Sequence, residues 1–128
     1  MNYKRLIPCI FIYQGKAVKW FDNLEILSDD VVKLAKKYND MGADELLVFD
    51  LSTTDEEHDH AIDLMKKMNR VIRIPMVAGG NIRRQEDVKK ILYTGAKRAI
   101  LNFSKALSVE LIEDLSLIHI SEPTRLAL

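Results

Sequence analysis

Polar and glycine residues stand at the ends of apolar runs in this sequence. Asp50 ends one run, and Gly79, Gly80 and Asn81 follow another. Paired glycines let the backbone turn tightly and approach a ligand closely, and Asn tolerates a left-handed conformation. A helix that starts just after Asn81 would point free N–H groups at this turn, a geometry that binds phosphate. A plain β-to-α turn without a ligand explains the same residues.

Other side chains have a simpler interpretation. The position of Asp50 favours a functional role for this residue, because a carboxylate that ends a buried strand needs a partner. His58 and His60 suggest a metal site, but two positions apart on a helix they face different ways, so we expect both to be solvated. Cys9 lies in an apolar run and is expected to be a buried structural thiol. We therefore expect no metal and no cofactor.

Strand and helix patterns alternate along the chain and would position these residues. Strands are expected over 6–12, 45–51, 74–78 and 98–102, with a hairpin partner over 16–20. Helices are expected after an N-cap at Ser28 or Asp29, from Asp55, after Asn81 and from Ser108. Such alternation predicts a parallel sheet covered by helices. Asp50, the glycine turn and Asn102 would then lie at one end of the sheet.

Aromatic and sulfur-containing side chains have expected places in this fold. Met65 and Met68 fall on the apolar face of the second helix and should fill the core. Trp20 and Phe21 follow the hairpin and are expected to pack at the edge of the core.

Length and composition describe an ordinary globular domain. The chain has 128 residues, 48% of them hydrophobic and 30% charged, with 19 basic and 19 acidic residues. The balanced charge argues against nucleic-acid binding, and no apolar run approaches the ~20 residues of a membrane span. One cysteine cannot form an internal disulfide, which favours a reducing, cytoplasmic setting.

Ordered motifs over residues 4 to about 114 resemble a known family. They are Lys4–Cys9, Gly15–Lys19, Ala35–Tyr38, Gly42–Leu46, Val48–Ser52, Ile74–Arg83 and Gly95–Arg98 with Asn102. The family is that of the (β/α)8 barrels of histidine biosynthesis, and the motifs are closer to the imidazole glycerol phosphate synthase cyclase than to the aminoimidazole carboxamide ribotide isomerase. The resemblance implies an α/β fold: half of a TIM (β/α)8 barrel, with four β-α units over residues 1–114.

The resemblance also implies roles for particular positions. The acid/base aspartate of the family stands where this chain has Phe11, so no catalytic residue of this half is intact. Lys19 and Asp50 match substrate-binding positions. The implied phosphate-binding residues are Gly79, Gly80, Asn81, Asn102 and Ser104. Asn81 replaces a third glycine, and Phe103 replaces a threonine.

The last residues depart from the family. Residues 115–128 have no counterpart in it and read like the translation of a sequencing-library adapter. We expect them to be a non-native tail, although a divergent natural terminus is the alternative.

Two functions from different classes follow from the resemblance. The first is a truncated cyclase, inactive as this chain, acting in its parent on a phosphorylated ribosyl aminoimidazole with ammonia from a glutaminase partner. The second is a non-catalytic barrel domain fused ahead of a phosphoribosyl-AMP cyclohydrolase / phosphoribosyl-ATP pyrophosphohydrolase. In either case the first and fourth strands should be unpaired, which predicts self-association.

Overall fold

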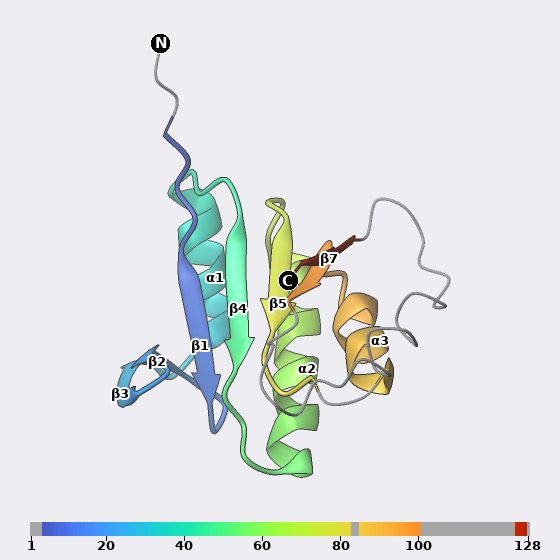
Figure 1. Ribbon diagram of the computed structural model, residues 1–128. Helices are drawn as coiled ribbons and strands as arrows, with labels where there is room; N and C mark the ends of the chain where they lie inside the picture. The colour runs from blue at the N-terminus through green and yellow to red at the C-terminus, as the bar shows by residue number, and fades with distance from the viewer. Residues whose placement is uncertain (1–3, 83–84, 101–124, 128) are drawn as a thin grey trace.

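The computed structural model describes residues 4–82, 85–100 and 125–127. These residues form one sheet of seven strands and three helices (Figure 1). The strands are β1 (Cys9–Tyr13), β2 (Lys16–Trp20), β3 (Asn23–Ser28), β4 (Leu46–Asp50), β5 (Met76–Gly79), β6 (Arg98–Ile100) and β7 (Arg125–Ala127). The helices are α1 (Val31–Asp40), α2 (Asp55–Val71) and α3 (Gln85–Tyr93).

The sheet combines a parallel series with an antiparallel extension. Its strand order is β3-β2-β1-β4-β5-β6-β7. Strands β1, β4, β5, β6 and β7 pair in parallel, whereas β2 and β3 add to β1 as an antiparallel meander. Parallel strands that alternate with helices on one face form part of a TIM barrel, as the sequence predicts.

The core lies between the helices and one face of the sheet. Its largest fully buried side chains come from β1, β4 and β5 on one side and from α1, α2 and α3 on the other. Met65 and Met68 of α2 are both 0% exposed, which confirms that they fill the core.

The opposite face of the sheet is open in the described part of the chain. Because side chains alternate along a strand, Ile10 and Ile12 enter the core while Cys9 and Phe11 face the other way. Cys9 is exposed, so the prediction of a buried thiol is wrong. The apolar run indicated burial on both faces, but at Cys9 the face away from the helices is not covered. The atoms that partly cover Cys9 still raise the pKa of its thiol, which lowers its reactivity.

Side-chain caps explain where the first two helices begin. Asp30 caps α1, since its carboxylate accepts a hydrogen bond from Lys33 N at 3.0 Å. The predicted cap at Ser28 or Asp29 is therefore wrong by one or two positions, and Ser28 Oγ instead accepts a bond from Asp30 N at 3.2 Å. Thr54 caps α2 by accepting from Glu57 N at 3.1 Å, so α2 starts at Asp55 as predicted.

The first and the fourth of the predicted parallel strands, β1 and β6, each have a further strand paired on their outer side. We predicted that the first and fourth strands would be unpaired. That is wrong, because β2 pairs with β1 and β7 pairs with β6. The strands at the edges of the described sheet are β3 and β7. We predicted no strand over β3, although Leu24 and Ile26 alternate there with polar residues, and the side chains of β3 are largely exposed.

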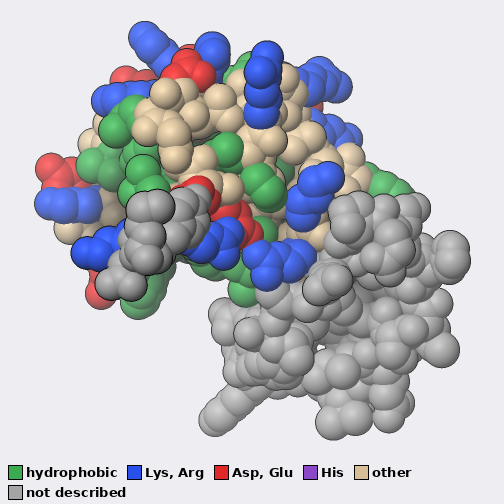
Figure 2. Space-filling view, turned by 90° about the horizontal axis from the view of Figure 1, so that it is seen from above, with side chains coloured by type: hydrophobic (Ala, Val, Ile, Leu, Met, Phe, Trp, Pro, Cys, Tyr) green, Lys and Arg blue, Asp and Glu red, His purple; other side chains and the backbone are tan. Residues whose placement is uncertain are grey.

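A buried acid links distant parts of the chain at the amino ends of the parallel strands. Glu45 is 5% exposed, and its carboxylate accepts hydrogen bonds from Arg5 at 3.1 Å and from Arg98. Figure 2 views the molecule from this end, and Lys and Arg side chains surround its rim. Pairing with two guanidinium groups offsets the cost of burying the carboxylate.

Several predicted features lie outside the described residues. They are Asn102, Phe103, Ser104, the helix from Ser108 and the boundary at Asp114. None of the described helices could span a membrane, since each is too short or too polar.

Candidate functional site

The carboxyl ends of β4 and β5 bring Asp50 and the glycine turn together. Phe49 pairs with Gly79 in the parallel register, so Asp50 lies beside Gly80 at the lower end of the sheet in Figure 1. A Cβ built on Gly80 would lie 2.8 Å from the backbone nitrogen of Asp50 and would overlap its carbonyl oxygen. Asp50 and the glycine turn, both predicted to belong to the site, are thus in direct contact.

The turn itself has the predicted left-handed backbone. Gly80 has a φ of +91° and Asn81 a φ of +54°. Gly79 is also constrained, because a Cβ there would lie 2.8 Å from Ile100 Cβ. Close packing against the neighbouring strands therefore requires both glycines, whether or not a ligand binds.

The Asn81 side chain ties this turn to the loop after β4. Its Nδ2 donates hydrogen bonds to Ser52 O at 2.6 Å and to Ser52 Oγ at 2.7 Å. The loop is held at its other end by Glu57, whose carboxylate accepts from Thr53 N at 3.0 Å. These bonds order both loops at the carboxyl end of the sheet.

A buried histidine occupies the space between this loop and α2. His58 Nδ1 lies 2.5 Å from Asp50 Oδ2, and Asp50 Oδ1 accepts a bond from Ser52 N at 2.9 Å. His58 is only 7% exposed, so the prediction that it is solvated is wrong. His60 is exposed, as expected.

A second carboxylate faces the other ring nitrogen of His58. Asp87 of α3, which is 3% exposed, places Oδ1 3.7 Å from His58 Nε2. The hydrogen bond to Asp50 raises the pKa of His58, and the charges of Asp50 and Asp87 reinforce that rise. Burial and the charge of Lys90 act on this pKa in the opposite direction. The imidazole is thus held between carboxylates from a strand and a helix.

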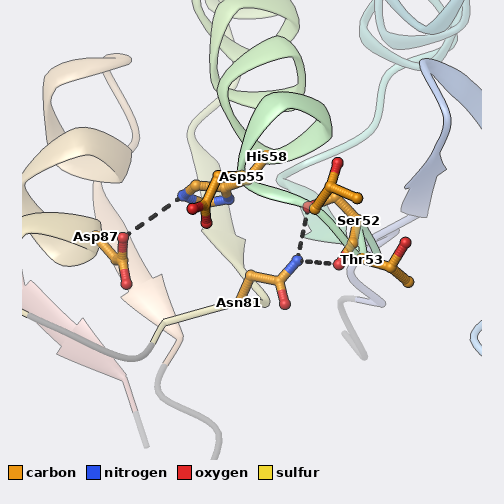
Figure 3. A pocket seen from close by; sticks show the side chains of 7 residues that line it. Ser52, Thr53, Asp55, His58, Asn81 and Asp87 are labelled. Carbon is orange, nitrogen blue, oxygen red and sulfur yellow. Dashed lines mark hydrogen bonds and ion pairs between the residues drawn. The ribbon is translucent and has the colours of Figure 1, made fainter.

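A polar cavity of about 220 Å³ opens beside this group (Figure 3). It lies between the β4–α2 loop, the start of α2, the β5–α3 turn and α3. Its lining residues are Ser52, Thr53, Thr54, Asp55, His58, Asn81 and Asp87.

A larger cavity of about 910 Å³ lies on the open face of the sheet. Aromatic side chains form part of its wall. The Phe11 ring is 5.0 Å from the Trp20 ring and stacks on Phe49 at 5.3 Å. Trp20 and Phe21 are 49% and 59% exposed, so they line this cavity without being buried in the core edge.

The structure does not bring Lys19 to either cavity. Its ammonium lies 3.6 Å from Glu25 on the neighbouring strand, and both side chains are exposed. Of the predicted site residues, Asp50, Gly79, Gly80 and Asn81 lie together, with Phe11 across the open face.

His58 and Asp87 were missed as site residues, although one signal identifies His58. It precedes Ala61, Ile62 and Met65 with the spacing of one helix face, and those three are buried. Asp87 has no comparable signal, because an acidic residue in the first turn of a helix is usually solvated. No group of three or more His, Cys, Asp or Glu among the described residues could hold a metal ion.

Comparison with known proteins is consistent with this barrel-type architecture. The family model described as "Histidine biosynthesis protein" matches residues 5–128. The chain is 40% identical over 118 residues to the imidazole glycerol phosphate synthase subunit HisF of Exiguobacterium sibiricum. It is also 40% identical over 117 residues to the same subunit of Flavobacterium psychrophilum. Both alignments cover 91% of this chain and 47% of the relative, so the chain spans about half the length of these relatives.

The fold is thus that of a partial TIM barrel with its polar site at the carboxyl ends of the strands. The chain belongs to the histidine biosynthesis protein family, and within it resembles the cyclase subunit.

Proposed function

We propose that this chain is the amino-terminal half of a histidine-biosynthesis barrel that binds a phosphorylated ribosyl small molecule but does not close the imidazole ring. The observation that carries the proposal is the environment of Phe11. This residue is 8% exposed and packs between the rings of Trp20 and Phe49. Ring closure needs a group that can accept and return a proton, and a phenyl ring can do neither.

The test is a ring-closure assay on the purified chain. Its substrates are the phosphoribosyl aminoimidazole intermediate and ammonia, with the full-length Flavobacterium psychrophilum subunit as a positive control. We expect turnover from the control and none above background from this chain. Ring closure above background by this chain would overturn the proposal.

Phosphate binding belongs to the glycine turn in this proposal. Gly80 and Asn81 line the open cavity, which supports the assignment, and Gly79, Asn102 and Ser104 complete the proposed set. Titration with inorganic phosphate, followed by NMR, should shift the backbone amide signals of Gly80 and Asn81. Unchanged signals at both residues would contradict phosphate binding there.

Substrate contacts are proposed for Lys19 and Asp50. Lys19 can leave its pair with Glu25 at little cost, since exposed ion pairs contribute about 0–1 kcal/mol. The side chain of Asp50 is already bonded to His58 and Ser52. We therefore propose that Asp50, which lines the larger cavity, contacts the substrate while these bonds hold it in place, and that Lys19 supplies positive charge to a phosphorylated ligand.

A second candidate function is a non-catalytic barrel domain at the amino terminus of a fused phosphoribosyl-AMP cyclohydrolase / phosphoribosyl-ATP pyrophosphohydrolase. The packing of Phe11 favours it, and so does the Asn81 amide, which donates to Ser52 at two atoms. The candidates differ in partner. A cyclase parent would bind a glutaminase subunit, whereas a fused hydrolase would not. Co-purification of the full gene product with a glutaminase would favour the first.

A further inference from the structure

The polar cavity beside His58 has a composition that the proposed phosphate site does not explain. Its walls come from the β4–α2 loop, the start of α2, the β5–α3 turn and the first turn of α3. It is lined by hydroxyl, carboxylate, amide and imidazole groups. Its volume is about 220 Å³. One water molecule occupies about 30 Å³ in the liquid, so a small polar molecule fits.

His58 presents an unsatisfied nitrogen to this cavity. Its Nδ1 is committed to Asp50 at 2.5 Å. Its Nε2 is buried and has no hydrogen-bond partner among the described residues. Asp87 Oδ1 lies 3.7 Å from Nε2, which is too far for a hydrogen bond. A buried ring nitrogen without a partner is costly, so an external group that bonds to Nε2 would stabilise this arrangement.

The charge of the lining selects against anions. The carboxylate of Asp55 faces the cavity, and Asp50 lies directly behind His58. Glu56 and Glu57 add negative charge in the same helix turn. A phosphate placed against these carboxylates would be repelled by them.

A hydroxyl group satisfies both sides of the cavity. It can donate to a carboxylate and also accept from, or donate to, a ring nitrogen. It therefore suits His58 Nε2 in either protonation state. Two adjacent hydroxyls could bond to Nε2 and to the Asp55 carboxylate together.

The cavity also adjoins the larger one on the open face. Ser52, Thr53 and Asn81 line both. A ligand with a hydroxyl-bearing part in the polar cavity could thus extend past Asn81 toward the glycine turn.

We propose that the polar cavity between α2 and α3 is a binding site for a neutral polyol, of the kind presented by the vicinal diol of a ribosyl group. Only the choice of ribose rests on the proposed function. The site assignment stands on the unsatisfied His58 nitrogen and the Asp55 carboxylate.

The test is an NMR titration of the full chain with D-ribose and, separately, with inorganic phosphate. D-Ribose should shift the ring signals of His58, and phosphate should not. Asp55→Asn should weaken the response to ribose about tenfold, the effect of losing a hydrogen bond to a charged group. The control Glu56→Gln changes the same helix turn outside the cavity and should leave the response unchanged.

The outcomes separate this site from the phosphate site. Asp55 is exposed, so its substitution should preserve the fold, and an unchanged amide spectrum would verify this. No response of His58 to D-ribose, or equal responses in the Asp55→Asn and Glu56→Gln variants, would overturn the polyol site. If phosphate does not shift the amide signal of Gly80, the result contradicts the phosphate site of the proposed function and leaves the polyol site unaffected.

Discussion

Gly80 and Gly42 have nearly the same backbone conformation in very different surroundings. Their φ angles are +91° and +89°. A Cβ on Gly80 would overlap the backbone of Asp50, whereas a Cβ on Gly42 would meet nothing within 4 Å. Alanine substitutions at these two positions therefore distinguish the cost of a left-handed backbone from the cost of steric overlap.

We expect Gly80→Ala to be much more destabilising than Gly42→Ala. A left-handed alanine costs about 1–2 kcal/mol at either position. Overlap with Asp50 should add about 1–3 kcal/mol at position 80 only. Urea unfolding monitored by circular dichroism measures both free energies of unfolding. Equal losses would mean that the turn relaxes away from Asp50.

His58 should make stability depend on pH in a defined direction. Its pKa is raised in the folded state, chiefly by the hydrogen bond to Asp50. Its contribution is therefore complete below the unfolded pKa of about 6.5 and is lost as the pH rises through the folded pKa. The free energy of unfolding of the unsubstituted chain should fall as the pH rises above about 6.5.

The matched variants are His58→Gln and His60→Gln. The first should remove this pH dependence, and the second should retain it because His60 is exposed. Urea unfolding at a series of pH values on either side of neutrality measures the slopes. Parallel curves for the unsubstituted chain and His58→Gln would contradict the assignment.

The β4–α2 connection shows how one element is positioned for the site. Thr54 caps α2, and Glu57 bonds back to the N–H and hydroxyl of Thr53. These contacts fix the first turn of α2, which carries Asp55 and His58 to the cavity.

Loss of the cap should loosen α2 at this end. Thr54→Ala should lower the free energy of unfolding by about 1 kcal/mol, while Thr54→Ser, which keeps the hydroxyl, should cost little. Amide hydrogen exchange should speed up first at Glu57 and His58 in the alanine variant. Uniform exchange along α2 would contradict local loosening.

Sequence reasoning predicted the elements whose signals are local. The start and apolar spacing of α2 and the glycines of the β5 turn are examples. It failed where tertiary contacts decide. β3 forms because β2 offers it a partner, Cys9 is exposed because one sheet face is open, and His58 is buried because Asp50 and Asp87 surround it. No local pattern encodes such contacts.

The described part of the molecule has one packed face and one open face. The aromatic cavity lies on the open face, and β3 adds an edge strand with exposed Leu24, Ile26 and Leu27. Unpaired edge strands with exposed apolar side chains favour association between chains.

Self-association therefore remains our expectation, now based on β3. Light scattering at high protein concentration should detect a dimer or larger species. Ile26→Lys should reduce it, while Tyr93→Lys, at a 78% exposed position at the end of α3, should not. A monomer at every concentration would refute the prediction.

The buried Glu45 also bears on the order in which the chain folds and opens. Its partners Arg5 and Arg98 lie 40 and 53 positions away in sequence. Such distant contacts are costly to form before the parallel strands align. They should therefore form after the transition state, so that Glu45→Gln accelerates unfolding and hardly slows refolding in stopped-flow measurements. The two arginines would then slow the unfolding of the chain without speeding its folding, and so set the lifetime of the folded state.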